Sequence, residues 1–195
     1  PSAQWTATAA GAMLLAGKKS GDRMETDCKG KVSILRNVRV ESGTVGKIID
    51  AGVKDANQMG SAMAPAAVDT ILNHLQDTGR QLDYYDAVFT GDLGFIGKDI
   101  VKDLLSDAGV PEKQIENVYD DCGCMIYEPR QDVHSGGSGC GCSASIFAGY
   151  VYRKMRRGNI SRALIISTGA LLSTISPFQG ESIPGIAHAV SLEIE

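Results

Sequence analysis

The chain has 195 residues, 43% of them hydrophobic and 22% charged, which is typical of a globular domain with a real core. A net charge of −4 excludes a general attraction to nucleic acid. No apolar run reaches the roughly 18 residues of a membrane-spanning helix. No signal peptide is recognised, and because the chain begins at Pro1 we expect it to be part of a longer protein.

The first third of the chain is predicted to be mostly strand. Residues 5–16 are small, apolar and compatible with a strand, and residues 18–31 are polar and glycine-rich, as in a turn-rich connection. Apolar residues then alternate from Val32 to Val40, which predicts a strand that runs irregularly to Ile49.

Helices and strands alternate through the middle of the chain. After a loop at residues 52–61, apolar residues from Met63 to Leu75 predict a helix ending near Gly79, with Pro65 in its first turn and His74 on its surface. The next elements predicted are a buried strand at 87–90, a helix at 96–108 and a strand at 115–119.

The last third is predicted to carry two long loops, which inside a compact domain are usually functional. In chain order we expect a loop at 120–141, a helix at 143–157, a strand at 163–167, a loop at 168–185 and a closing strand at 186–195. The order from Lys31 onward is therefore β-α-β-α-β-α-β-β, which predicts an α/β fold with a five-stranded mixed sheet.

A glycine-rich stretch joins the first of these loops to its helix. It reads Asp132-Val133-His134-Ser135-Gly136-Gly137-Ser138-Gly139-Cys140-Gly141-Cys142. One interpretation is a tight loop packed beneath a neighbouring strand. The other is the floor of a pocket, with His134 at its mouth and free N–H groups that could hold an anion.

Two further features leave alternatives open. His188 shares the apolar side of the closing strand, where a histidine is either a satisfied core residue or, beside the polar loop before it, a site residue. Arg153, Lys154, Arg156 and Arg157 close the third helix, where cations suit the helix dipole or, less commonly, an anionic membrane surface.

The five cysteines are expected to be reduced. Cys122 with Cys124, and Cys140 with Cys142, form two C-x-C pairs rather than the C-x₂₋₄-C spacing typical of zinc sites, so we predict neither a metal nor a cofactor. Cys140 or Cys142 beside a helix N-terminus could have a lowered pKa, which leaves a thioester-dependent acyltransferase as an alternative function.

Several segments together resemble the stage V sporulation protein AD family. They are Gln4 to Thr6, Met63 to Ala67, Thr90 to Gly94, Asp132 to His134 with its glycine loop, Thr168 to Ser173, and Gln179 to Val190. The resemblance covers nearly the whole chain and corresponds to the C-terminal half of the family. Cys124 is outside the pattern.

The resemblance implies a thiolase-like fold, shared with beta-ketoacyl carrier-protein synthase III, in which two similar β-α-β-α-β-α-β-β halves pack together. Residues 1–28 would be the final strand and linker of the N-terminal half, and residues 29–195 the C-terminal half. That N-terminal half would be a partner, and the surface meant for it could also support a homodimer.

By this resemblance, the enzymes of the superfamily carry a histidine in the loop that is Thr90 to Gly94 here, where Asp92 is the nearest polar group, and an asparagine at or near His134. A carboxylate cannot replace an imidazole that stabilises an oxyanion, so no catalytic residue is predicted and enzymatic activity is not expected. The resemblance instead implies binding of dipicolinic acid, or its calcium chelate, during uptake into the developing spore. The protein would lie peripherally at the spore inner membrane, after synthesis in the forespore cytoplasm, with other proteins of the same sporulation operon.

Dipicolinate is a flat, doubly anionic aromatic acid, so its site needs N–H donors and small residues. We expect the ligand-binding residues to be His134, Gly136, Gly137, Gly139, His188 and Asp92. The two histidines should meet at the sheet edge where ligands of parallel sheets bind.

Overall fold

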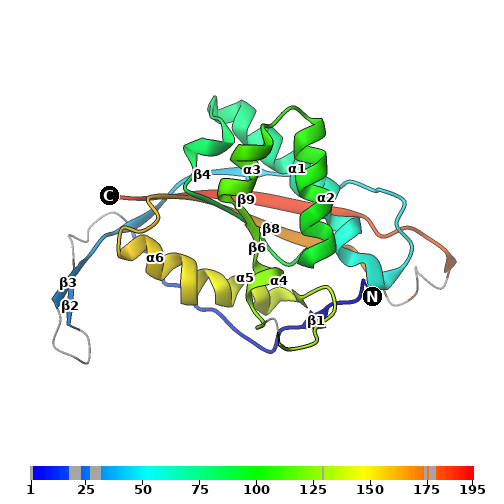
Figure 1. The fold of residues 1–195 in the computed structure, drawn as a ribbon, viewed down its shortest axis with the longest axis horizontal. Helices are drawn as coiled ribbons and strands as arrows, with labels where there is room; N and C mark the ends of the chain where they lie inside the picture. Colours follow the sequence, from blue (N-terminus) through cyan, green and yellow to red (C-terminus); the bar gives the residue numbers. More distant parts are fainter. Residues whose placement is uncertain (1, 18–22, 27–31, 129, 174, 176–178) are drawn as a thin grey trace.

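The computed structural model describes residues 2–17, 23–26, 32–128, 130–173, 175 and 179–195. Its centre is a five-stranded mixed sheet in the order β4-β9-β8-β5-β6 (Figure 1). These strands are β4 (Val38–Val45), β5 (Ala87–Thr90), β6 (Tyr119–Asp121), β8 (Arg162–Ala170) and β9 (Gly185–Ile194). β9 is antiparallel to both β4 and β8, whereas β8, β5 and β6 are parallel. The predicted α/β class, the mixed sheet and the closing strand are confirmed.

Helices cover both faces of this sheet (Figure 1). One face carries α1 (Met59–Thr78), α2 (Gly94–Asp107) and α3 (Glu112–Val118), and the other a continuous helix made of α5 (Cys140–Ile146), a π-helical segment η3 (Phe147–Val151) and α6 (Tyr152–Arg156). The short elements are β1 (Trp5–Thr6), β2 (Arg23–Thr26), β3 (Val32–Leu35), η1 (Ala56–Gln58), η2 (Leu82–Tyr84), α4 (Cys122–Met125) and β7 (Gly137–Ser138).

Two apolar clusters, one on each face, hold the layers together. Ile71 of α1 packs with Val88, Leu164 and Ile166 of the sheet, and all four are buried. On the opposite face Val151 and Met155 pack with Phe89, Ala163 and Leu192. Because alternate residues of β5 and β8 enter opposite clusters, both strands are buried on both sides.

Helix α1 starts four residues earlier than predicted, and this corrects the expected position of Pro65. The 3₁₀ turn η1, capped by Asp55 through the Asn57 N–H, leads directly into Met59, so Pro65 lies inside the helix rather than in its first turn. The end at Gly79 is as predicted, because Gly79 adopts a left-handed φ of 65° and the Arg80 N–H bonds back to the Leu75 carbonyl.

His74 was predicted to lie on the surface of α1, and this is wrong. Its side chain is fully buried, with Nδ1 2.8 Å from Thr44 Oγ1 and Nε2 2.7 Å from the Tyr85 hydroxyl. Both ring nitrogens therefore have partners, which makes the burial of a polar ring tolerable.

The strand predicted at residues 115–119 is also wrong over most of its length. Pro111 precedes a helix, α3, in which the Gln114 and Ile115 N–H groups bond to the Pro111 carbonyl. Ile115 and Val118, three residues apart, pack against the core, so the apolar spacing was helical. The strand β6 begins only at Tyr119.

The N-terminal segment is a strand only at Trp5–Thr6, not over 5–16 as predicted. β1 pairs in parallel with the two residues of β7, apart from the main sheet as expected, and in the described residues no other strand continues the ladder. Leu14 and Leu15 are 95% and 81% exposed.

The other boundary differences are smaller. The strand predicted from Val32 to Ile49 is divided into β3, which pairs with β2, and β4, which pairs with β9. The predicted loop at 120–141 contains α4 and β7, and β8 extends past Ser167 to Ala170. Most of the turn-rich connection at 18–31 and part of the loop at 168–185 lie outside the described residues.

Candidate functional site

Asp92 and Gly139, two of the predicted site residues, meet at the edge where β5 and β8 end. The Asp92 carboxylate accepts the Gly139 N–H at 2.8 Å through Oδ2 and the Thr168 hydroxyl at 2.9 Å through Oδ1. Burial raises the pKa of Asp92, while these two donors favour its ionised form. Through these two hydrogen bonds, Asp92 links the end of β5 to the start of α5 and to β8.

His188 lies on β9 between Ser167 of β8 and Val45 of β4. Its ring is exposed, and Nδ1 accepts the Gly46 N–H at 3.1 Å. A nitrogen that accepts this bond carries no proton, so the neutral ring carries its proton on Nε2. Ser167, directly opposite on the same face of the sheet, is exposed as well. The pair presents an imidazole N–H and a hydroxyl on an uncovered part of the sheet.

His134 lies on the loop before β7 with a left-handed φ of 54°, and its backbone pairs with that of Gln4. Its Nδ1 is 3.7 Å from Asp132 Oδ1. The Gln4 side-chain amide donates to the carbonyls of Asp92 and Gly137, which ties this region to the same sheet edge. No hydrogen bond or ion pair joins the two histidines in the described part of the chain, so their meeting in one pocket stays a prediction.

The glycine loop is packed beneath the N-terminal segment. The Ala7 N–H bonds to the Ser138 carbonyl at 2.8 Å, and a Cβ on Gly141 would lie 2.0 Å from the Ala9 carbonyl oxygen. Gly136, at a φ of 100°, faces the Gly123 carbonyl in the same way. These contacts require glycine for close packing, which favours the tight-loop interpretation; direct contact of Gly136, Gly137 or Gly139 with a ligand stays a prediction.

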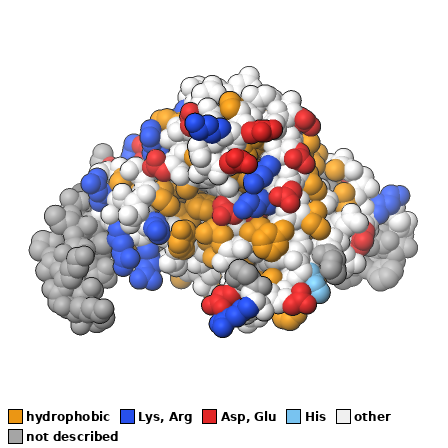
Figure 2. All heavy atoms as spheres, viewed as in Figure 1, with side chains coloured by type: hydrophobic (Ala, Val, Ile, Leu, Met, Phe, Trp, Pro, Cys, Tyr) orange, Lys and Arg blue, Asp and Glu red, His pale blue; other side chains and the backbone are white. Residues whose placement is uncertain are grey.

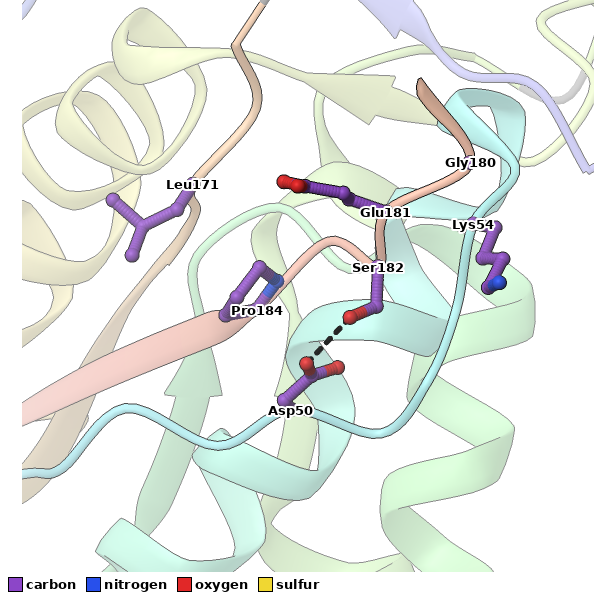
Figure 3. A pocket seen from close by; sticks show the side chains of 7 residues that line it. All are labelled: Asp50, Lys54, Leu171, Gly180, Glu181, Ser182 and Pro184. Atoms are coloured by element: carbon purple, nitrogen blue, oxygen red, sulfur yellow. Dashed lines mark hydrogen bonds between the residues drawn. The ribbon is translucent and has the colours of Figure 1, made fainter. Parts of the chain in front are cut away.

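A cavity of about 530 Å³ lies beside the start of β9, between two loops that sequence reasoning had not placed together (Figure 3). In Figure 3 the Ser182 hydroxyl and the Asp50 carboxylate point toward each other, and the Ser182 hydroxyl donates to Asp50. The Ile183 N–H also bonds to the Val53 carbonyl at 2.7 Å. The lining residues are Asp50, Lys54, Leu171, Gly180, Glu181, Ser182 and Pro184.

Polar residues near Gly52 and Gly180 were the only sequence signal for this cavity. Asp50 and Ser182 are 132 residues apart, so their contact depends on the pairing of Ile49 with Gly185, which no local pattern reveals. The cavity contains both acidic and basic groups but none of the six predicted site residues.

Among the four cysteines that the structure describes, no buried thiol is activated. Burial raises the pKa of Cys142 to about 12 and that of Cys122 further, so the lowered pKa expected for Cys142 is wrong. Cys140 is exposed at the first position of α5. In the described ranges, no group of three or more His, Cys, Asp or Glu side chains is arranged to hold a metal ion. Nor does any described helix have the length and apolar character needed to cross a membrane.

With β-α-β-α-β-α-β-β order and one antiparallel closing strand, the chain has the architecture expected of a single thiolase-like half. Residues 1–193 match the family model described as Stage V sporulation protein AD (SpoVAD), and the chain belongs to that family. It is 46% identical over 157 residues to Stage V sporulation protein AD of Bacillus subtilis (strain 168). That match covers 80% of this chain but 46% of the relative, so the chain spans about half the length of the curated relative.

Solved structures with a related arrangement are thiolase-like enzymes. An OleA variant of Xanthomonas campestris has a TM-score of 0.45 and 10% identity, over 83% of this chain and 59% of that chain. FabH, the 3-oxoacyl-(acyl carrier protein) synthase III of Xanthomonas oryzae pv. oryzae, has a TM-score of 0.43 and 11% identity, over 82% of this chain and 57% of that chain. Similarity at this level supports no inference about a shared site or reaction.

Proposed function

We propose that this member of a sporulation protein family binds dipicolinic acid, or its calcium chelate, for uptake into the developing spore. In this proposal it acts peripherally at the spore inner membrane together with other proteins of its operon. Family membership supports a role in sporulation, and the site supports an anion-binding role rather than condensing chemistry.

The observation that carries the proposal is the hydrogen bond from the Gly46 N–H to His188 Nδ1. It leaves His188 Nε2–H as a donor on an exposed face, beside the Ser167 hydroxyl. A carboxylate accepts only, so the Nε2–H of the neutral His188 ring and the Ser167 hydroxyl suit one carboxylate of dipicolinate.

Asp92 argues against the condensing reaction of the related enzymes. By the resemblance, it is the nearest polar group in the loop where those enzymes carry a histidine. Both oxygens of its carboxylate already accept hydrogen bonds, from Gly139 and Thr168. A carboxylate held in this way orients the loop but offers an oxyanion no positive charge. The alternative, an acyltransferase acting on a thioester, depends on the exposed thiol of Cys140.

Calorimetric titration of the intact protein with dipicolinate, with and without calcium, tests the proposal. His188→Ala should weaken binding by about 1.5–3 kcal/mol, the typical value of a hydrogen bond to a charged group. His134→Ala should do the same if both histidines meet the ligand. Val190→Ala is the matched control, because Val190 is exposed on the same face of β9 and offers no donor.

Two results would contradict this assignment. If His188→Ala folds normally and keeps its affinity for dipicolinate, His188 does not contact the ligand. If the protein instead hydrolyses or transfers an acyl thioester and Cys140→Ser abolishes that reaction, the acyltransferase alternative is correct.

A further inference from the structure

Four exposed residues form a stripe along the end of the α5–η3–α6 helix. They are Tyr150, Arg153, Lys154 and Arg157, which we call the cationic stripe. The spacing i, i+3, i+4, i+7 places them on one helix face. Phe147, Val151 and Met155 belong to the apolar cluster beneath the sheet. This part of the helix is therefore amphipathic, with its polar face formed by three cations and one tyrosine.

Among the described residues, no acidic side chain is paired with a cation of the stripe. In the described residues, Arg153, Lys154 and Arg157 form no ion pair, and Lys154 Nζ lies 5.4 Å from the centre of the Tyr150 ring. A fourth exposed cation, Arg36, comes from the β3–β4 corner, where its N–H bonds to the Arg156 carbonyl at 2.9 Å.

Figure 2 shows Lys and Arg side chains gathered at the end of the molecule where α6 lies. This concentration contrasts with the net charge of −4 of the whole chain. The helix dipole accounts for cations in the last turn, but it acts only there. It explains neither Arg36, which belongs to a different element, nor the exposed Tyr150.

We propose that the cationic stripe, with Arg36 beside it, is a docking surface for a bilayer that contains anionic phospholipid. Clusters of Lys and Arg on an amphipathic helix bind anionic lipid headgroups, and tyrosine is favoured at the interface between headgroups and acyl chains. The cations stand on the outward face of a helix, which suits a planar lipid surface; the cavity of about 530 Å³ lies elsewhere, between the loops of Asp50 and Ser182. This inference names the residues that would hold the protein at a membrane, as the proposed function requires. It does not depend on the identity of the small ligand.

Co-sedimentation of the intact protein with lipid vesicles tests the inference. One set of vesicles is phosphatidylcholine alone, and the other contains about one third phosphatidylglycerol. The unmodified protein should bind the anionic vesicles, and salt should weaken this binding. Arg153→Gln/Arg157→Gln should lower the partition coefficient by about fivefold for each cation removed. The matched control is Lys102→Gln/Lys113→Gln, which removes the same charge from α2 and α3 and should bind like the unmodified protein.

The outcomes separate this inference from the proposed ligand. The Arg153→Gln/Arg157→Gln variant should keep the far-UV circular dichroism and the dipicolinate affinity of the unmodified protein. If the unmodified protein binds anionic vesicles but not dipicolinate, the result counts only against the ligand proposal. Equal vesicle binding by the stripe variant and its control would overturn the docking surface. So would an unmodified protein that ignores anionic vesicles but binds an acidic protein or RNA through the same residues.

Discussion

The Asp92 carboxylate accepts the backbone N–H of Gly139 at 2.8 Å, which joins the end of one sheet strand to the loop that opens a helix on the far side of the sheet. The same carboxylate holds the Thr168 hydroxyl at 2.9 Å. Asp92, the central polar residue of the candidate site, therefore also stabilises the fold. Its substitution should affect stability as well as any ligand.

Asp92→Asn should lower the free energy of unfolding by about 1–3 kcal/mol, because an amide offers one acceptor oxygen where two donors are now satisfied. Urea denaturation measures this change. Asp99→Asn, at an exposed position of α2, is the control and should change stability by less than about 0.5 kcal/mol. Equal stabilities for the two variants would mean that the Gly139 and Thr168 bonds contribute little.

Gly141→Ala should destabilise the protein, because the added Cβ would lie 2.0 Å from the Ala9 carbonyl oxygen. Gly149→Ala on the same continuous helix is the matched control, since no atom lies within 4 Å of its Cβ position. The expected cost at Gly141 is about 1–3 kcal/mol, and Gly149→Ala should be neutral or slightly stabilising. Thermal melting of both variants gives the comparison. Were Gly141→Ala to melt normally but bind ligand poorly, the loop would serve the ligand rather than packing.

Local patterns predicted the sheet and the long helices because their periods are strong. The alternation in the closing strand correctly predicted that His188 shares a face of β9 with Val190, but His188 and Val190 are exposed whereas Ala187 and Ala189 on the other face are buried. The apolar spacing of α2 predicted the start of that helix to within two residues. Pairings between distant residues were not predictable in this way. The Asp92–Gly139 bond spans 47 residues and the Asp50–Ser182 bond 132, so both depend on the completed fold.

Short elements and buried polar residues were the other misses, for physical reasons. β7 and α4 contain two and four residues, fewer than one period of any reliable pattern. His74 has a polar ring on a helix, which usually indicates exposure. Its burial depends on Thr44 and Tyr85, 30 and 11 residues away, which satisfy its two nitrogens.

Asp121 lies at the same edge of the sheet, at the end of β6, and gives a sharper test of buried hydrogen bonding. Its two oxygens accept the Thr90 hydroxyl at 2.7 Å and the N–H groups of Leu93, Gly94 and Gly123 at 2.9–3.0 Å. Burial raises its pKa to about 6 even against these four donors. Asp121→Asn should cost about 2–5 kcal/mol, since the amide nitrogen would face two donors.

Asp120→Asn is the control for that measurement. Asp120 is half-exposed and pairs with Lys98 at 2.7 Å, so its loss should cost at most about 1 kcal/mol. Urea denaturation of the two variants should therefore separate them clearly. If Asp121→Asn were the milder change, the four hydrogen bonds would not anchor α2 and α4 as we infer.

His74 should make the protein less stable in mild acid. Burial lowers its pKa from the ordinary value of 6.5; Arg80 lowers it further, while Glu41 and Asp77 act in the opposite direction. A group whose folded pKa is depressed contributes stability that is fully present above its unfolded pKa and is lost as the pH falls through its folded pKa. Stability should therefore decrease below about pH 6.5 as the unfolded state takes up a proton that the buried ring resists.

Urea denaturation at about pH 7.5 and about pH 5.5 measures the decrease. His74→Gln should be less stable than the unmodified protein at the higher pH, because Gln cannot reach both Thr44 and Tyr85, yet it should lose less stability between the two pH values. His134→Gln, on an exposed loop, controls for the removal of one imidazole. An acid dependence that is identical in His74→Gln and the unmodified protein would show that another group, not His74, titrates on unfolding.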